Sequence, residues 1–593
     1  MLTGKYINKY YLKYAIPFII GIIALVAVDF FQLKIPEYLG DIVNSIGKGT
    51  LDIPNMVFEL VTIGVIMCIC RILWRLALLT TSKKIETSLR RQMFEKSERL
   101  SQKFYHENKV GTVMAWYTND LETIEEYFGW GSIMLVDAIF MSVLVICKMV
   151  GLNWALSLVT AIPVLLIVVW GGLVEKFMSL KWDKRQQAFD NLYDFTQENF
   201  TGIRVIKAFV KENQEIKAFA KIARKNKDVN IDFVKTSVLF DVLIEVICGL
   251  VFAILLAIGG YFVYCYSIGE PVVIFGLLIE LDSGSLVEFV LYFESLIWPL
   301  IAMGQIISMR SRSKASLKRI THFLDQEEDV KNPENAHVLT DVKGRITFNE
   351  FSFMYPDANS NSLEGVSFEI APGEIVGIVG KIGSGKTTLV NSLLRLYNVK
   401  ENTLFIDGYD IMKCDIPSVR AAISYVPQDN FLFSDKVRNN IAFSNLALEY
   451  EKIEMAAKFA AVHENIIEFT EGYDTVSGER GVTLSGGQKQ RVSIARAYIK
   501  EAPIMIMDDS VSAVDVKTEE TILQNIKEKR AGKTTLVIAS RVSTVMHMDK
   551  ILVLDDGRVE AFGTHQELTE KSEIYKRMVF LQELEKEVEG GAN

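Results

Sequence analysis

Two neighbouring carboxylates follow an apolar run that is typical of a buried strand. The run covers residues 504–507, and Asp508 and Asp509 come directly after it. A carboxylate at the end of a buried strand is well placed to hold a hard divalent cation such as Mg²⁺, which prefers oxygen ligands. We therefore expect Asp508 to be a metal ligand. The second acid raises a separate question, because a longer carboxylate at that position would reach further.

A glycine-rich loop at residues 380–388 is the second chemical element. Its sequence, GKIGSGKTT, fits the phosphate-loop pattern and stands between an apolar strand-like run and a helix-like run. The glycines let backbone N–H groups turn toward phosphates, and the helix N-terminus adds a favourable field. Lys386 can reach the outer phosphates and the Thr387 hydroxyl can ligate Mg²⁺. The expected nucleotide-binding residues here are Gly380, Gly383, Ser384, Gly385, Lys386, Thr387 and Thr388.

The pentapeptide LSGGQ at residues 484–488 precedes a run with helical spacing. At this pentapeptide the sequence resembles the ATP-binding cassette (ABC) transporters, whose signature motif it is, and the resemblance covers essentially the whole chain. It implies that the loop at 380–388 is the Walker A motif, that the strand ending at Asp508 is Walker B, and that SAVD ending at Asp515 is the D-loop. It also implies ATP as the nucleotide, with Mg²⁺. Further contacts to ATP or its metal are implied for Tyr355 (on adenine), Gln428 (Q-loop, also metal-binding and catalytic), Ser485, Gly487 and Gln488.

Six membrane spans with long cytosolic extensions, fused ahead of one nucleotide domain, resemble an exporter-type half-transporter. In that family two chains assemble, and each ATP lies between the Walker motifs of one chain and the signature of the other. Residues 104–120 and 196–210 match the two coupling-helix regions, of which the first should touch mainly its own nucleotide domain and the second the partner's. SGERG at residues 477–481 resembles the exporter segment that contacts the coupling helices.

Two residues depart from the family pattern. Most members have glutamate after the Walker B aspartate, where it orients and polarises the attacking water, and here that residue is Asp509. A carboxylate drawn back by about 1–1.5 Å loses near-attack geometry, and an error of about 1 Å can cost about 10²-fold in rate. The family's switch histidine, which contacts the γ-phosphate, is replaced by the shorter Ser540. The chain thus resembles the degenerate-site subunit of heterodimeric bacterial multidrug ABC exporters: its own site should bind ATP and hydrolyse it poorly.

The first half of the 593-residue chain is rich in long apolar runs. A spanning helix needs about 20 mostly apolar residues. Lysine and arginine are concentrated in segments 81–110 and 181–227 and after the last apolar run, so these segments and both termini are expected to be cytosolic. The protein is therefore expected in the cell membrane as a multi-pass protein. The six spans are predicted at residues 15–33, 57–80, 131–151, 153–176, 238–264 and 285–308.

Composition divides the chain into two domains. We expect an all-α six-helix transmembrane domain at residues 1–325, a polar linker at 326–340 and an α/β P-loop ATPase domain at 341–593. The net charge of −9 argues against nucleic acid as a partner, because phosphate-backbone binding needs clustered basic surface. The stretch 267–285 has an apolar core too short to cross a bilayer, so we interpret it as an external loop that can lie on the membrane surface.

Ionisable residues inside the predicted spans are clues to the cargo. Such residues are costly in a bilayer and tend to face a water-filled cavity. One interpretation is that they pair with cations of a partner chain or lie at the water interface. The other is an acidic cavity suited to cationic amphiphiles. The residues are Asp29, Asp137, Lys148, Asp241, Glu245, Glu288 and Glu294.

The leading functional prediction is ATP-driven export of amphiphilic small molecules, lipids or peptides. The expected partners are a second, non-identical ABC half-transporter, the amphiphilic substrate and membrane lipids. Two alternatives use the same fold: an ATP-regulated channel or sensor, and a homodimeric exporter with slow hydrolysis. ATP-dependent flux against a gradient separates a pump from a channel.

Overall fold

The computed structural model describes residues 3–48, 52–274, 277–478, 481, 483–511 and 514–590. The chain forms two compact units. The first contains the residues up to 97 together with 110–326, and the second contains 98–109 and the residues from 327 onward. The sequence-based boundaries had placed 98–109 in the transmembrane domain. These residues group with the second unit because their short helix contacts residues of that unit.

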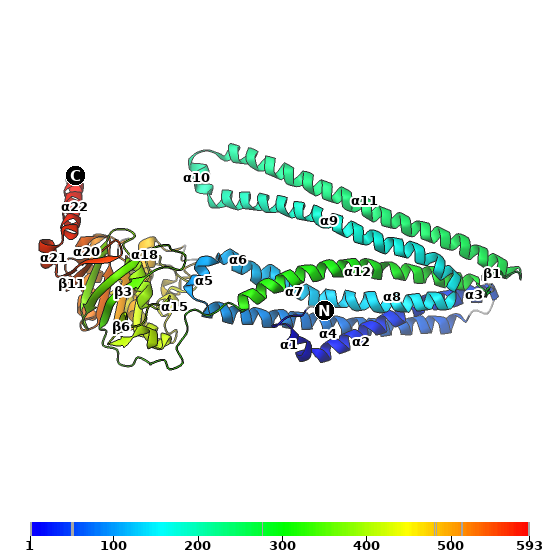
Figure 1. Cartoon of the computed structure of the whole chain (residues 1–593), viewed down its shortest axis with the longest axis horizontal. Helices are drawn as coiled ribbons and strands as arrows, with labels where there is room; N and C mark the ends of the chain where they lie inside the picture. Colours follow the sequence, from blue (N-terminus) through cyan, green and yellow to red (C-terminus); the bar gives the residue numbers. More distant parts are fainter. Residues whose placement is uncertain are drawn as a thin grey trace. The chain divides into compact units, whose positions relative to one another are not determined.

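The first unit is helical (Figure 1). Its long helices continue well beyond the length of one membrane span, as the helical spacing of the charged segments predicted. Its elements are α1 Asn8–Lys13, α2 Ala15–Gln32, α3 Lys34–Lys48, α4 Ile53–Arg99, α6 Val110–Ala115, η1 Trp116–Asp120, α7 Leu121–Glu126, η2 Tyr127–Gly131, α8 Ser132–Leu152, α9 Trp154–Thr201, α10 Ile203–Ala208, α11 Glu212–Ser267, β1 Val272–Ile274, β2 Leu277–Ile279 and α12 Ser283–Leu324.

Five helical stretches in the described residues are long and apolar enough to cross a membrane. They contain the first, second, third, fifth and sixth predicted spans, so each of these five lies in a helix of sufficient length and apolarity. The fourth predicted span lies in α9, a 48-residue helix in which most side chains between 163 and 179 are outside the described residues. The five stretches are Ala15–Gly47, Ile53–Arg99, Val110–Leu152, Glu212–Ser267 and Ser283–Leu324.

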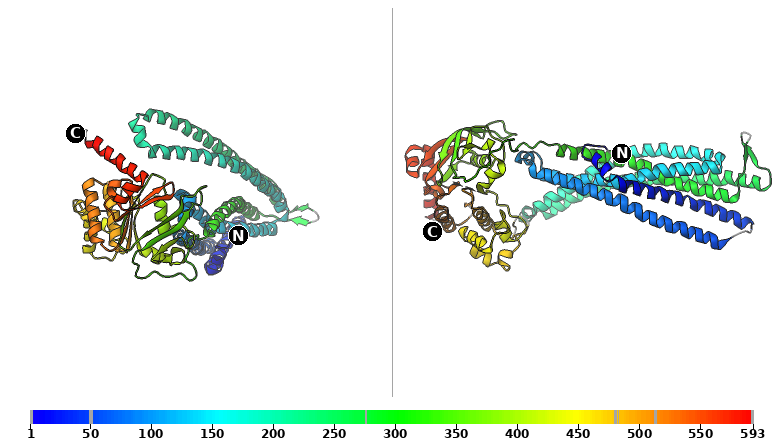
Figure 2. Two further views of the ribbon diagram at one scale, coloured as in Figure 1. Left: turned by 60° about the vertical axis from the view of Figure 1, so that its left-hand side comes forward. Right: turned by 90° about the horizontal axis from the view of Figure 1, so that it is seen from below.

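Within this unit α9 packs along α11, and α8 packs along α12. Figures 1 and 2 show the α9–α11 hairpin diverging from α8 and α12 toward its tip at α10. Apolar side chains on the spanning part of α11, such as Leu239 (60% exposed) and Leu250 (58%), therefore stay uncovered by this chain. A helix that is apolar on several faces requires lipid or another protein chain around it.

The stretch expected as an external loop contains an antiparallel hairpin. Val272 of β1 pairs with Ile279 of β2. Ile279 and Leu281 are buried in the same apolar cluster as Phe289 and Tyr292 of α12. The end of this segment is thus anchored in the core of the helical unit rather than lying free of it.

The second unit is an α/β domain. Strand order in its six-stranded sheet is β12-β11-β5-β10-β9-β8, in which all neighbouring pairs are parallel except β11–β12. A four-stranded antiparallel sheet has the order β4-β3-β6-β7. The strands are β3 Ile346–Phe353, β4 Leu363–Ile370, β5 Ile375–Gly380, β6 Leu404–Ile406, β7 Tyr409–Asp410, β8 Ile423–Val426, β9 Ile504–Asp508, β10 Thr534–Ile538, β11 Lys550–Asp555 and β12 Arg558–Gly563.

The central strands β9 and β10 are buried at every position, which explains the apolar runs 504–507 and 536–538 within them. Helices cover the sheet, so the expected α/β nucleotide domain following a helical membrane domain is confirmed. The helical elements of the unit are α5 Gln102–Glu107, α13 Lys386–Leu393, η3 Ile411–Lys413, α14 Ile416–Ala421, α15 Val437–Ile441, α16 Tyr450–Phe459, α17 His463–Ile467, η4 Gly472–Asp474, α18 Gly486–Ile499, α19 Val516–Lys529, α20 Val542–Val545, α21 His565–Lys571 and α22 Glu573–Gly590.

Candidate nucleotide site

The carboxyl ends of four neighbouring parallel strands bring the candidate residues to one edge of the sheet. The phosphate loop follows β5, Asp509 follows β9, and Ser540 follows β10 after one residue. Gln428 comes two residues after β8, which is the strand next to β9. Ligands of open α/β sheets bind at this edge.

The phosphate loop has a backbone that only its glycines can adopt without strain. Gly383 and Gly385 have φ angles of 85° and 95°. A Cβ atom on Gly380 would lie 2.3 Å from the carbonyl oxygen of Leu554, and one on Gly385 would lie 2.7 Å from the carbonyl oxygen of Ser362. α13 begins at Lys386, directly after Gly385, so the last three residues of the 380–388 motif form its first turn. The cradle for a phosphate group is therefore built into the backbone.

Replacing Gly380 with alanine should reduce ATP affinity of the full-length chain by about tenfold or more, because overpacking against a fixed backbone costs about 1–3 kcal/mol or more. Equilibrium binding of a non-hydrolysable ATP analogue measures this. Gly111→Ala is the control, because nothing lies within 4 Å of a Cβ atom at that position in α6. Unchanged affinity in Gly380→Ala would show that the loop can adjust.

Lys386 is half-buried at the mouth of the loop. Its ammonium group donates hydrogen bonds to the carbonyl oxygens of Gly380 (2.7 Å) and Lys381 (2.8 Å). Burial lowers the pKa of Lys386, and the nearby carboxylates of Asp509 and Asp508 partly offset this effect. The ammonium is thus held over the loop by groups that an anionic ligand can replace.

Asp508 has the surroundings of a cation ligand. Its side chain is 2% exposed, and its Oδ2 atom has no hydrogen-bond partner among the described residues. Burial raises the pKa of Asp508, while a hydrogen bond with the Thr387 side chain lowers it. A buried carboxylate is stabilised by a cation, so these two residues fit Mg²⁺. The described residues contain no cluster of three or more His, Cys, Asp or Glu that could hold a metal, so the site would need oxygens from the nucleotide as well.

The two residues that depart from the family pattern touch each other. The Ser540 hydroxyl donates to Asp509 Oδ1 at 3.5 Å. Asp509 has a φ angle of 44°, and its backbone is held by a bond from its N–H to the carbonyl oxygen of Ile538 (3.0 Å) and by Gln490, whose Nε2 donates to the Asp509 carbonyl (3.2 Å). These bonds fix the position of the Asp509 Cα atom, so the length of the side chain limits how far its carboxylate can reach.

Tyr355 lies beside the first turn of α13. Its hydroxyl donates to Thr388 Oγ1 (3.2 Å) and accepts from Asn391 Nδ2 (3.3 Å). Its ring packs edge-to-face against Phe353 and Tyr397, with centroids 5.1 and 5.3 Å away. The ring is half-buried, so one part of it stays available to a ligand. Its stacking on adenine remains a prediction.

The signature residues form the N-terminus of α18. Ser485 caps this helix, with its hydroxyl accepting from the backbone N–H of Gln488 (3.3 Å) and the Gln488 side chain accepting from the backbone N–H of Ser485 (2.9 Å). Ser485 is exposed, and the Gly487 carbonyl accepts from Arg491 (3.3 Å). An exposed hydroxyl at the N-terminus of a 14-residue helix is suited to bind an anion.

The remaining motif residues are partly described. Asp515 caps α19 by accepting from the Thr518 hydroxyl (2.7 Å) and backbone N–H (3.2 Å), and the hydroxyl bond is the main cause that lowers the pKa of Asp515. Ser512 and Ala513 of the D-loop lie outside the described residues, as do Glu479 and Arg480 of SGERG.

Helix α5 of the first coupling region contacts the nucleotide unit. Nε2 of His106 lies 2.9 Å from Asp357 Oδ2, and this hydrogen bond lowers the pKa of Asp357. The same region and Tyr355 line a cavity of about 530 Å³. The contact agrees with the expectation that this region touches its own nucleotide domain.

Several ionisable residues of the spans find partners inside this chain. Lys148 forms an ion pair with Glu37, and Glu288 accepts from the Tyr292 hydroxyl (2.8 Å). Asp137 accepts from Trp298 Nε1 (2.8 Å) and interacts with Asp29, whose side chain is 3% exposed. Asp241, Glu245 and Glu294 stay exposed.

Sequence reasoning missed two arginines in the second span and one acid near the third helix. Arg71 and Arg75 are exposed on α4, four residues apart. Scanning the predicted spans for arginine as well as for acids would have found both. Glu37 was missed because it lies beyond the predicted end of the first span, yet it pairs with Lys148.

The fold and the site together define a class of protein. A helical membrane unit precedes an α/β unit with a phosphate loop, a Walker B strand and a capped signature helix, which is the organisation of an exporter-type ABC half-transporter. Family models agree: "ABC transporter transmembrane region" matches residues 18–300 and "ABC transporter" matches residues 363–512.

The chain belongs to the ABC transporter family. It is 33% identical over 99% of its length to "Probable multidrug resistance ABC transporter ATP-binding/permease protein YheI" of Bacillus subtilis (strain 168), covering 98% of that protein. It is 34% identical to "Multidrug resistance-like ATP-binding protein MdlA" of Escherichia coli (strain K12), over 95% of this chain and 94% of that one. The solved structure of a bacterial Atm1-family ABC exporter with ATP bound superimposes with a TM-score of 0.74 at 26% identity, covering 97% of this chain and 98% of that one.

These relationships settle the general activity and location. The protein is a multi-pass membrane protein of the cell membrane. Its ABC domain binds ATP, and its ATPase activity is coupled to export. ABC exporters work as dimers of such half-transporters.

Proposed function

We propose that this chain is the slow-hydrolysing half of a heterodimeric exporter. The observation that carries the proposal is the contact between Ser540 and Asp509 (3.5 Å), because both altered residues then act on one nucleotide. The phosphate cradle, Lys386 and Asp508 retain the groups needed for binding ATP with Mg²⁺. Only the groups that activate water and contact the γ-phosphate are shortened.

The short side chains affect hydrolysis more than binding. The backbone of Asp509 is hydrogen-bonded to Ile538 and Gln490. A backbone shift that moved the Asp509 carboxylate closer to the γ-phosphate would therefore break those bonds. A carboxylate that stops about 1 Å short is a poor base for water. When bound, Mg²⁺ at Asp508 and Thr387 would neutralise phosphate charge, and it does not compensate for a misplaced base.

The intact signature supports a competent site on the partner. Ser485 is exposed and backed by a complete capping box, so its hydroxyl and the N-terminal N–H groups of α18 are already arranged for an anion. Such preorganised donors account for large rate factors in group transfer. In a heterodimer the nucleotide that uses them belongs to the other chain.

The second coupling region also supports a partner chain. At the tip of the α9–α11 hairpin, Phe209 is 70% exposed and Val210 is 80% exposed. The short helix α10, which directly precedes Phe209, has no buried residue. An apolar tip of this kind is suited to insert into the nucleotide domain of a partner.

The proposed cargo is an amphiphilic small molecule, lipid or peptide. Relatives named for multidrug resistance support this class. The exposed charges in the spans are of both signs, with Asp241, Glu245 and Glu294 against Arg71 and Arg75. This mixture weakens the case for a purely acidic, cation-selective cavity.

Purified alone, the chain should hydrolyse ATP at only a few per cent of the rate of the pair formed with its non-identical partner, because two copies of it supply two shortened sites. Steady-state ATPase in lipid nanodiscs, with the chain alone and co-purified with a non-identical half-transporter that has Glu after its Walker B aspartate and a switch histidine, measures this. Vigorous turnover by the chain alone would instead indicate a homodimeric exporter. Uptake into inverted vesicles against a gradient distinguishes the pump from an ATP-regulated channel.

A further inference from the structure

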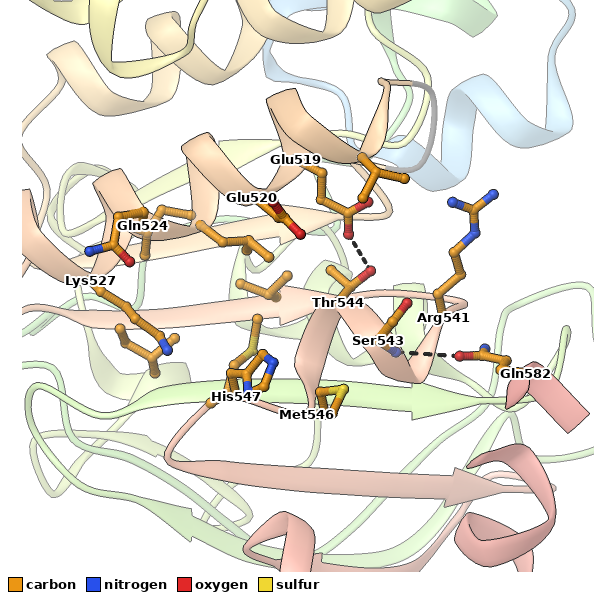
Figure 3. A pocket seen from close by; sticks show the side chains of 16 residues that line it. Glu519, Glu520, Gln524, Lys527, Arg541, Ser543, Thr544, Met546, His547 and Gln582 are labelled. Carbon is orange, nitrogen blue, oxygen red and sulfur yellow. Dashed lines mark hydrogen bonds between the residues drawn. The ribbon is translucent and has the colours of Figure 1, made fainter. Parts of the chain in front are cut away.

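The segment 540–543, which contains Ser540, is hydrogen-bonded to the C-terminal helix α22. Gln582 of α22 accepts hydrogen bonds from the backbone N–H groups of Val542 (2.8 Å) and Ser543 (3.3 Å), and its Nε2 donates to the carbonyl oxygen of Ser540 (3.4 Å). Figure 3 shows Gln582 beside Ser543. Arg541 provides no side-chain cap for α20, so Gln582 satisfies N–H groups that the helix itself leaves open.

The other side of α20 is tied to α19. The Thr544 hydroxyl donates to the Glu519 carboxylate, and the two residues are 4% and 7% exposed. A hydrogen bond to a buried carboxylate is strong and costly to lose. Since α19 begins directly after Asp515, this bond links α20 to the D-loop.

α20 is packed on one side only: Val542 and Val545 are buried in the core of the unit. A cavity of about 720 Å³ lies alongside it, lined among others by Gln524, Lys527, Met546 and His547 (Figure 3). A well-packed interior would resist displacement on every side. On the side of the cavity, hydrogen bonds add to the packing of Val542 and Val545 in holding the segment, and Gln582 supplies three of them.

We propose that Gln582 is a positioning residue for the nucleotide site of this chain. It holds the backbone of Ser540 on the side facing α22, while the hydroxyl of the same serine contacts Asp509 on the other side. The C-terminal helix thereby sets where the side chain at position 540 meets the Walker B end. This inference rests on the proposed function for its consequence in catalysis, and its structural part rests on the hydrogen bonds of the segment itself.

Amide hydrogen exchange of the full-length chain tests the structural part. Gln582→Met keeps the side-chain size and removes both polar groups, so the amides of Val542 and Ser543 should exchange about tenfold faster or more. Gln524→Met makes the same change in the same cavity, where the native side chain bonds to Glu528 (2.5 Å), and it should leave those amides protected. Unchanged exchange in Gln582→Met would overturn the proposal.

A conservative variant separates positioning from general packing. Gln582→Glu keeps an oxygen that accepts from Val542 and Ser543 and places a second oxygen against the Ser540 carbonyl, where a donor stood. Exchange at Val542 and Ser543 should return toward the native rate. If Gln582→Glu behaves like Gln582→Met, the two N–H bonds are not what holds the segment and the proposal is wrong.

The catalytic consequence is tested in a background with restored hydrolysis. In Asp509→Glu/Ser540→His, assembled with its partner, adding Gln582→Met should lower the recovered turnover of this chain's site about fivefold and change KM little, the size of one net hydrogen bond. Adding Gln524→Met should change neither. If Gln582→Met leaves the recovered turnover unchanged, the inference is wrong. A double variant that recovers no turnover contradicts instead the part of the proposed function that assigns slow hydrolysis to the reach of Asp509 and Ser540, and the exchange result still decides the role of Gln582.

Discussion

Ser485→Ala in the assembled heterodimer should lower steady-state ATP hydrolysis by about 10²-fold, whereas Lys386→Ala should lower it only severalfold. The Ser485 hydroxyl is exposed at the N-terminus of α18, where it would contact the γ-phosphate held by the partner, and loss of one such preorganised donor costs about 10²–10³. Lys386 serves this chain's own slow site. Steady-state ATPase of the reconstituted pair measures both.

The Ser485 variant needs a control for its structural role, because losing an N-cap destabilises a helix by about 1 kcal/mol. Thr564→Ala removes an equivalent capping box, in which Thr564 and Glu567 bond reciprocally at the start of α21. It should leave hydrolysis close to the native rate. Equal losses from Ser485→Ala and Lys386→Ala would indicate two equivalent sites and contradict the heterodimer proposal.

Asp509→Glu should raise hydrolysis at this chain's own site by about tenfold, and adding Ser540→His should raise it further. The first change restores about 1–1.5 Å of reach, and the second restores a side chain long enough to contact the γ-phosphate. The two residues touch, so their effects on one transition state should be non-additive. Single-turnover hydrolysis in the pair, with the partner's site inactivated, isolates the signal.

Two controls sharpen that experiment. Asp509→Asn keeps the short side chain and removes the base, so it should not exceed the native rate. Ser540→Ala removes the contact with Asp509 and should not restore hydrolysis either. If Asp509→Glu/Ser540→His stays as slow as the native chain, reach is not what limits this site, and an altered signature on the partner is the next residue set to examine.

The motifs could be predicted from the sequence because the residues of each motif are contiguous in the chain. Walker A, Walker B and the signature are continuous stretches, and the structure places the first two at the ends of β5 and β9, the two strands that flank β10. The spans were also predictable, since bilayer thickness fixes the length of an apolar helix.

Contacts between distant segments were not predictable in the same way. Nothing local to Gln582 indicates that it caps α20, which is about 40 residues earlier, and the bond between Glu519 and Thr544 likewise depends on how two helices meet. The hairpin at β1 and β2 was read as a loop because its strands have only three residues each. Tertiary packing decides such features, and periodicity carries no information about them.

The identity of the nucleotide in this chain's own site during turnover is the most direct test. The assembled transporter is allowed many turnovers with ATP that is labelled on the γ-phosphate and carries a photoreactive adenine. The nucleotide cross-linked near Tyr355 is then isolated, and the fraction that still carries its γ-phosphate is measured. The account predicts that the native site retains ATP while the partner's site turns over many times, and that Asp509→Glu/Ser540→His converts it to ADP faster. Finding ADP in the native site after a single turnover would contradict it.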